Sequence, residues 1–252
     1  MLKVILQGCS GKMGKTITEL VENEEKMVIV AGIDKKMEKD NKYPVYSSLD
    51  QCSKTADVVV DCSSQEAVKD VLFYCVNKKT PLVICTTGYS DLQREWIKKA
   101  STKIAVFQSA NMSEGINILK FILKKTVGFL EKSGFDIEIV EKHHRQKKDV
   151  PSGTASLLAD TINQALGGRY IYNISRRAGE RNEHEIGISS VRGGTIFGEH
   201  EIIFAGEDEM IEIRHMAYSR KIFGKGVIKA VKFIAGKERG LYDMDNMMVE
   251  ME

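Results

Sequence analysis

The stretch that decides the fold is Leu2–Gly14, Leu-Lys-Val-Ile-Leu-Gln-Gly-Cys-Ser-Gly-Lys-Met-Gly. The apolar run Lys3–Gln7 is typical of a buried strand, and after the glycines Met13, Ile17 and Leu20 recur at helical spacing. A glycine loop between a strand and a helix lets the backbone approach a phosphate, and the helix N-terminus offers unpaired N–H groups. The order therefore predicts a pyrophosphate-binding turn, although its G-x-x-G-x-x-G spacing departs from the usual G-x-G-x-x-G.

The candidate pyrophosphate contacts are the residues of this loop: Gly8, Cys9, Ser10, Gly11, Lys12, Met13 and Gly14. Asp34 ends the next apolar run, 20 residues after Gly14, where an acid binds the adenosine ribose hydroxyls. The alternative interpretation is a plain glycine-rich turn, with Asp34 capping a loop. Such a turn would not require a strand, a loop, a helix, a second strand and an acid to follow one another in this order. Asp34 favours the free 2′-hydroxyl of NADH, whereas the adjacent Lys35 can meet the 2′-phosphate of NADPH. The sequence leaves the choice of cofactor open.

The rest of the first 110 residues alternates between strand-like and helical segments. Apolar runs at 27–34, 56–62, 81–86 and 104–108 are separated by segments of helical composition at 65–77 and 91–103. This alternation predicts the α/β class, with a parallel sheet covered by helices on both faces.

Two turns that follow predicted strands are further candidates for cofactor contact. They contain Cys85, Thr86 and Thr87, and Ser109, Ala110, Asn111 and Met112. The carboxyl ends of parallel strands meet at one edge of a sheet, where ligands bind. Ordinary surface turns would have the same composition, so both interpretations stay open here.

A different pattern begins near residue 113. Helical segments at 114–131, 154–166 and 226–235 accompany strand-like runs at 135–141, 185–191, 199–205 and 210–216. Strands that follow strands favour an antiparallel or mixed sheet, so we expect a second domain of α+β character.

The segment Glu141–Ala155, Glu-Lys-His-His-Arg-Gln-Lys-Lys-Asp-Val-Pro-Ser-Gly-Thr-Ala, carries the chemistry expected of a substrate site. His143 and His144 end a predicted strand, where neighbouring side chains point to opposite faces. One histidine can therefore face a pocket and deliver a proton, because imidazole titrates near neutrality. Lys147 adds a fixed positive charge close by.

The turn that follows these basic residues leads into a predicted helix. Ser152 or Thr154 is the expected N-cap, and together with Gly153 this turn offers hydroxyl and N–H groups to a carboxylate. A pocket for a small anionic substrate is the predicted function. A zinc site lacks a third ligand at metal spacing, and a solvated basic loop without function is the main alternative.

Composition limits the other classes of function. The 252 residues are 42% hydrophobic and 29% charged, with a net charge of +2, which gives no global attraction to nucleic acid. No apolar run approaches the roughly 20 residues that span a bilayer. The five cysteines form no C-x-x-C pair, so we expect a reduced, cytoplasmic protein without a metal site.

Taken together, these motifs resemble the 4-hydroxy-tetrahydrodipicolinate reductase (dihydrodipicolinate reductase) family of lysine and diaminopimelate biosynthesis. The resemblance rests on the glycine loop and on the segments 85–88, 111–115, 141–155 and 198–200. It implies a Rossmann-like cofactor domain of residues 1–112 and 223–252 and a substrate-binding and oligomerisation domain of residues 113–222. A homotetramer and hydride transfer from NADH or NADPH to a cyclic dicarboxylate, with loss of water, are likewise implied.

Residue roles follow from the same resemblance. His143 is implied as proton donor and Lys147 as its assistant, while His144, Ser152, Gly153 and Thr154 are implied to grip the dicarboxylate. Cys85 departs from the glycine that many members carry before the two threonines. A dehydrogenase for another amino or keto dicarboxylate, and a non-catalytic NAD(P)-sensing regulator, remain as alternatives.

Overall fold

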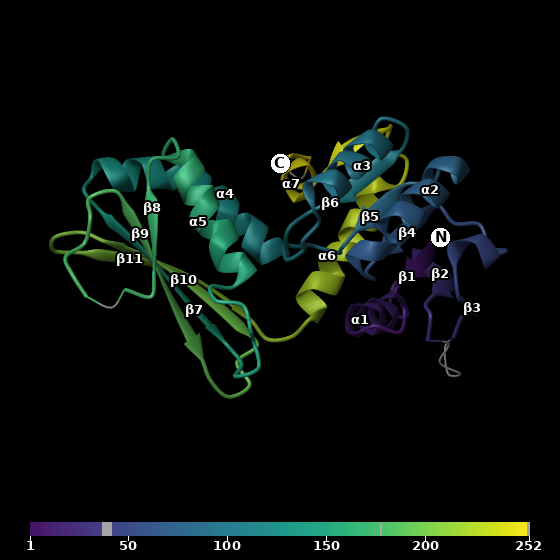
Figure 1. The fold of residues 1–252 in the computed structure, drawn as a ribbon, viewed down its shortest axis with the longest axis horizontal. Helices are drawn as coiled ribbons and strands as arrows, with labels where there is room; N and C mark the ends of the chain where they lie inside the picture. The colour runs from purple at the N-terminus through teal and green to yellow at the C-terminus, as the bar shows by residue number, and fades with distance from the viewer. Residues whose placement is uncertain (37–41, 177, 251–252) are drawn as a thin grey trace. The chain divides into compact units, whose positions relative to one another are not determined.

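A computed structural model describes residues 1–36, 42–176 and 178–250 (Figure 1). The chain divides into two units. The N-terminal unit comprises Met1–Glu114 together with Arg220–Glu252, and the central unit comprises Gly115–Ser219. Each unit is built around one sheet.

The sheet of the N-terminal unit has seven strands in the order β12-β6-β5-β4-β1-β2-β3, and every pair is parallel. Its strands are β1 (Leu2–Gln7), β2 (Met27–Ile33), β3 (Val45–Tyr46), β4 (Val58–Asp61), β5 (Leu82–Ile84), β6 (Ala105–Gln108) and β12 (Gly240–Tyr242). The predicted α/β class is confirmed. The short edge strands β3 and β12 were not predicted, because two or three residues carry no readable period.

Helices cover both faces of this sheet, as Figure 1 shows. They are α1 (Lys12–Val21), α2 (Val68–Lys78), α3 (Asp91–Ser101), α6 (Lys221–Ile234) and α7 (Met244–Val249), with 3₁₀ turns at Leu49–Gln51 and Gln65–Ala67. Val4 and Leu6 of β1 join a core with residues of α1 and α6, whereas Ile5 joins a second core with residues of α2 and α3. Burial on both faces explains why the strands read as continuous apolar runs.

Helix α6 returns to the N-terminal unit from the far end of the chain and packs beside α1. It begins at Lys221, five residues before the predicted start. A Cβ at Gly224 would lie 2.6 Å from Leu20 Cδ1, so the glycine permits the close approach of the two helices. The N-terminal unit is therefore completed by a segment that begins more than a hundred positions after its first segment ends.

The central unit contains a five-stranded mixed sheet in the order β11-β10-β7-β9-β8. Its elements are α4 (Glu114–Lys132, beginning one residue before the unit), β7 (Asp136–His143), α5 (Gly153–Ala165), β8 (Ile171–Ile174), β9 (Glu185–Arg192), β10 (Gly198–Ala205) and β11 (Met210–Ala217). Strand β9 is parallel to β7 and β8, and β10 is antiparallel to β7 and β11. The predicted α+β character is confirmed, and the exposed strand β8 is an element that the sequence analysis missed.

One face of the central sheet is buried under α4 and α5 (Figure 1). Along β7 the buried positions alternate: Ile137 and Ile139 pack in the apolar core, whereas Glu141 and His143 carry polar groups. The same face thus changes from apolar to polar toward the carboxyl end of the strand. This change places charged and titratable groups in a protected environment.

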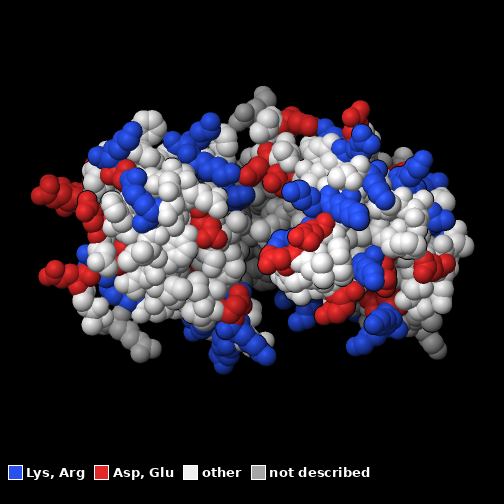
Figure 2. Space-filling model, turned by 45° about the horizontal axis from the view of Figure 1, so that its top comes forward, with Lys and Arg blue, Asp and Glu red and all other residues white. Residues whose placement is uncertain are grey.

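Outside the cores, basic and acidic side chains are intermingled on the face shown in Figure 2. Among the described residues, none of the helices combines the length and the apolar character required to cross a bilayer.

Candidate active site

The glycine loop of the N-terminal unit has the close backbone packing that its sequence predicts. Gly8 has a φ of +81°, and a Cβ there would lie 2.8 Å from the Cys62 carbonyl oxygen. A Cβ at Gly14 would lie 2.3 Å from the Gly8 carbonyl oxygen. Side chains are therefore excluded at both positions, and the chain passes tightly from β1 into α1.

Helix α1 begins at Lys12 without a capping side chain at Gly11 and without an acidic residue in its first turn. The first N–H groups of a helix have no partner inside it, and the helix dipole adds partial positive charge there. This end of α1 is suited to an anion such as a pyrophosphate.

Asp34 follows β2 and lies against the glycine loop. Its Oδ2 accepts a hydrogen bond from the Ser10 N–H at 3.0 Å, and its Oδ1 accepts one from the Lys36 N–H at 3.0 Å. Each carboxylate oxygen has two acceptor positions, so capacity remains for the hydroxyls of a ribose. Lys35 is exposed beside it.

A cleft of about 520 Å³ lies at this edge of the sheet, with Gly8, Gly11, Asp34 and Lys35 among its lining residues. An acid, a glycine loop and a helix N-terminus around one cleft fit the adenosine diphosphate half of a dinucleotide. The residues present thus match the requirements of NADH or NADPH.

Several predicted cofactor contacts have their side chains in the core. Cys9 and Met112 are buried, and Met13 packs partly against the same core. Asn111 is buried as well, and its Oδ1 accepts the Ser113 N–H at 2.8 Å. Contact between these residues and a cofactor would therefore involve the backbone.

The remaining predicted contacts follow β5 and β6. Cys85 packs partly against the core, and its N–H donates to the Asp61 carbonyl at 2.8 Å. Burial raises the pKa of the Cys85 thiol, which therefore stays protonated. Thr86 is half-buried, while Thr87 and Ala110 are exposed. The Ser109 hydroxyl donates to the Asn111 carbonyl at 3.0 Å.

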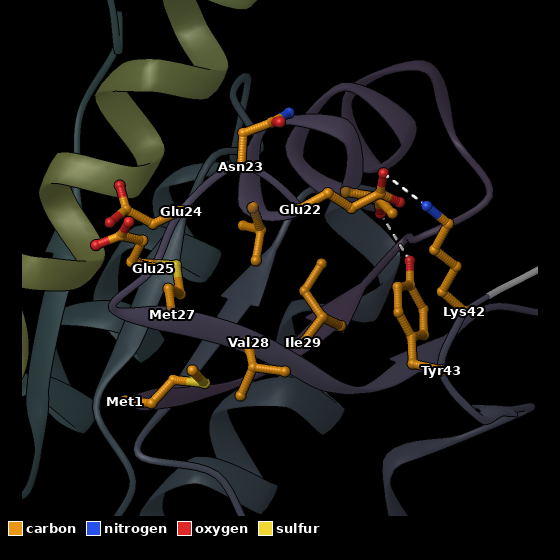
Figure 3. A pocket seen from close by; sticks show the side chains of 12 residues that line it. Met1, Glu22, Asn23, Glu24, Glu25, Met27, Val28, Ile29, Lys42 and Tyr43 are labelled. Carbon is orange, nitrogen blue, oxygen red and sulfur yellow. Dashed lines mark hydrogen bonds and ion pairs between the residues drawn. The ribbon is translucent and has the colours of Figure 1, made fainter.

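A second cavity of this unit, of about 500 Å³, lies at the opposite end of β2 (Figure 3). It is lined by Val28, Ile29 and Tyr43, and beside it the Lys42 ammonium pairs with Glu22 at 2.8 Å. Ligands of parallel sheets bind at the carboxyl ends of the strands, where Asp34 lies. The cavity in Figure 3 is therefore separate from the candidate cofactor site.

In the central unit the two adjacent histidines differ in burial. His143 is 8% exposed, and its Nδ1 lies 2.6 Å from Glu141 Oε2. His144 is half-buried and comes directly after β7. Lys147, in the loop that follows, pairs with Asp149 at 2.8 Å.

Ser152 is the N-cap of α5, which decides between the two predicted capping residues. Its hydroxyl accepts the Ala155 N–H at 3.1 Å and is hydrogen-bonded to His200 Nε2 at 2.9 Å. Its own N–H donates to Glu141 Oε1 at 3.1 Å. Gly153 is exposed, and a Cβ there would meet nothing within 4 Å, so the first turn of α5 is accessible. Thr154 is half-buried in that turn.

Burial governs the titration of this cluster. It lowers the pKa of His143, although the hydrogen bond to Glu141 opposes the shift. It lowers the pKa of His200 to about 3, so this ring stays neutral. Burial alone would raise the pKa of Glu141, but its hydrogen bonds with Arg192 and His143 bring it to about 2.

Three residues of this cluster, Glu141, Arg192 and His200, were not predicted as site residues. Arg192 on β9 donates two hydrogen bonds to Glu141, at 2.7 and 2.6 Å. His200 on β10 packs edge-on against His143, with ring centroids 5.3 Å apart. His200 lies in the segment 198–200 that contributes to the family resemblance, but no local pattern places His200 or Arg192 beside His143, because strand pairing brings them to β7 from distant positions.

Comparison with known proteins gives matches over nearly the whole chain. Family models described as the N-terminus and the C-terminus of dihydrodipicolinate reductase match residues 2–112 and 115–248. The 4-hydroxy-tetrahydrodipicolinate reductase of Clostridium novyi (strain NT) is 48% identical over 249 residues, which cover 98% of each chain. That of Caldanaerobacter subterraneus subsp. tengcongensis is 46% identical over 250 residues, again 98% of each chain.

Solved structures support the same assignment. The dipicolinate-bound dihydrodipicolinate reductase from Paenisporosarcina sp. TG-14 is 25% identical, with a TM-score of 0.79 over 96% of this chain and 97% of that chain. An aspartate dehydrogenase from Thermotoga maritima, 16% identical with a TM-score of 0.54, shares the fold. The chain therefore belongs to the 4-hydroxy-tetrahydrodipicolinate reductase (dihydrodipicolinate reductase) family.

Proposed function

We propose that this chain reduces 4-hydroxy-tetrahydrodipicolinate to tetrahydrodipicolinate, with loss of water, using NADH or NADPH. The observation that carries the proposal is the cluster at the carboxyl end of β7. There the Glu141 carboxylate, which lies 2.6 Å from His143 Nδ1, also accepts the Ser152 N–H, and the Ser152 hydroxyl caps the accessible N-terminus of α5. A proton donor beside an anion-binding turn is what reduction of a cyclic dicarboxylate requires.

The N-terminal unit supplies the residues for the dinucleotide, which provides the hydride when bound. The N–H groups of Lys12 and Met13 at the start of α1 would hold the pyrophosphate, and Asp34 would hold the adenosine ribose. The turns at 85–87 and 109–112 would border the nicotinamide half. We assign residues 1–112 and 223–252 to cofactor binding and residues 113–222 to substrate binding.

The central unit supplies the residues for the substrate. His143 would donate a proton from its ring, and Lys147 would exchange its partner Asp149 for a substrate carboxylate. The first turn of α5 would bind a carboxylate through the N–H groups of Gly153 and Thr154, with His144 and Ser152 completing the set. Burial of Glu141, His143 and Ser152 strengthens the electrostatic interactions among these three residues.

The face of the central sheet that points away from α4 and α5 supports self-association. Strand alternation places Ile171, Val191, Met210 and Met216 on that face, and each is at least 45% exposed. Apolar side chains exposed over three strands of one face favour a protein partner. We propose a homotetramer assembled through this sheet, which sedimentation equilibrium would measure directly.

The free state of all five cysteines supports a location in the cytoplasm.

The reaction is tested by a coupled assay with pyruvate, aspartate semialdehyde, the upstream synthase and this protein, with NADH and NADPH in parallel. We expect synthase-dependent oxidation of the nicotinamide. The ratio of the two rates decides between the preferences indicated by Asp34 and Lys35. Binding of pyridine-2,6-dicarboxylate, a planar mimic of the substrate, is measured in parallel. A dehydrogenase for another substrate, or a non-catalytic sensor, is not expected to bind this compound. Cofactor binding without oxidation and without dicarboxylate binding would refute the proposal.

A further inference from the structure

The Glu141 carboxylate is fully buried, and each of its oxygens has two hydrogen-bond partners. Oε2 lies 2.6 Å from His143 Nδ1 and accepts from Arg192 at 2.7 Å. Oε1 accepts from Arg192 at 2.6 Å and from the Ser152 N–H at 3.1 Å. A carboxylate has about four acceptor positions, so its hydrogen-bonding capacity is filled.

We propose that Glu141 is the positioning residue of the proton donor, and that it keeps a proton on His143 Nδ1 so that Nε2 is the atom that donates. The inference rests on the proposed function and deepens it. An ionised carboxylate can only accept, so the Nδ1 atom that faces it must carry hydrogen.

In the proton transfer that follows, His143 begins as an imidazolium with hydrogen on both ring nitrogens. The Nε2–H bond breaks, its proton passes to the substrate, and the electron pair stays on Nε2. The ring ends as neutral imidazole with Nδ1–H still bonded to Glu141, and solvent restores the lost proton.

Arg192 makes this arrangement possible, because it keeps Glu141 ionised. Its two hydrogen bonds to the carboxylate are parallel and bidentate, and its side chain is only 17% exposed. Without this cation, a buried carboxylate beside an imidazolium could take the proton itself. Arg192 also donates to the Asp149 carbonyl at 2.7 Å, which ties the basic loop to the same group.

The ring of His143 is held on other sides as well. His200 packs edge-on against it at an interplanar angle of 71°. A Cβ at Gly198 would lie 3.1 Å from His143 Nε2, so the glycine leaves room beside the donating atom. The charged or titratable groups around the ring are Glu141 on β7, Arg192 on β9, His200 on β10 and Lys147 in the loop.

A purely structural role for Glu141, as the counter-ion of Arg192, makes different predictions. In that case Glu141→Gln would reduce stability without changing the tautomer or the titration of His143. The test is therefore a nitrogen-15 NMR titration of the histidines together with the pH dependence of kcat. The control is Glu131→Gln, which removes a carboxylate that pairs with Arg169, away from both the histidine cluster and the proposed tetramer face.

We expect wild-type His143 to show the Nδ1–H tautomer. In Glu141→Gln its pKa falls, because the group that favours the charged ring has been neutralised. The alkaline limb of kcat then moves to lower pH, and kcat near pH 8 falls about 10- to 100-fold, the size of the loss when a metal-binding histidine loses its carboxylate partner. Cofactor affinity and the Glu131→Gln profile stay at wild-type values.

An Nε2–H tautomer in the wild-type protein would overturn the inference, and this measurement needs no variant. An unchanged His143 titration in folded Glu141→Gln would overturn it as well. The NMR readout requires no substrate, so it separates this inference from the proposed function. A wild-type protein with the expected tautomer but no reductase activity would refute the function alone.

Discussion

Ser152→Ala removes the hydroxyl that connects α5 to the histidine cluster, and its effect on stability can be worked out from the structure. The hydroxyl caps α5 through the Ala155 N–H, and loss of such a cap costs about 1 kcal/mol. It also bonds to His200 Nε2, and Ser152 is only 1% exposed. Leaving a buried ring nitrogen without a partner costs about 1–3 kcal/mol. We expect the unfolding free energy of the central unit to fall by about 2–4 kcal/mol.

Urea denaturation, followed by a probe in the central unit, measures this change. The control is Ser156→Ala, which removes a half-buried hydroxyl from the same helix at a position that does not cap it. We expect the control to lie within about 0.5 kcal/mol of the wild type. A Ser152→Ala protein as stable as its control would refute the interpretation of Ser152 as the residue that joins cap and cluster.

Three further predictions concern activity, cofactor binding and pH. His143→Ala or Lys147→Ala should lower kcat by about 10²- to 10⁴-fold, the usual contribution of a proton donor, while calorimetry finds unchanged affinity for NADH; normal turnover would contradict the site. Gly14→Ala should weaken or abolish NADH binding, because its Cβ would lie 2.3 Å from the Gly8 carbonyl oxygen, and wild-type affinity would contradict the loop assignment. Burial lowers the pKa of His200 to about 3, below the value of about 6.5 for an exposed histidine. The neutral ring therefore contributes fully to stability above about pH 6.5, and this contribution declines as the pH falls toward 3. Between pH 7 and pH 5 we expect this single group to lower the unfolding free energy by about 2 kcal/mol. Urea denaturation of His200→Gln at the two pH values should show a decrease that is smaller by this amount.

The two halves of the chain differ in how readily their folds could be predicted. In the N-terminal unit, β1, the glycine loop, α1 and Asp34 follow one another within 34 residues, and each has a local signature. The strands were predicted to within a few residues because burial on both faces makes them continuously apolar. Strands β3 and β12 are too short for such a signature, and their pairing depends on neighbours that the local sequence does not specify.

The candidate site in the central unit was predicted in part. The strand alternation that separates His143 from His144, and the capping position before α5, are local properties of the segment 141–155. Which hydroxyl caps the helix was left open; in the structure it is that of Ser152, which also bonds to His200 from β10. This second partner is 48 positions away, so the local sequence does not specify it.

The sequence by itself determined the class of each unit and the chemical types of group at its site, because glycine conformation, helix capping and strand alternation act over a few residues. The tertiary structure decided which partners those groups have. Glu141 and Arg192 are separated by 51 positions and meet because β7 and β9 pair in a register that aligns His143 with Arg192. Register depends on the packing of the whole sheet against α4 and α5, so the environment that controls His143 is a property of the folded unit.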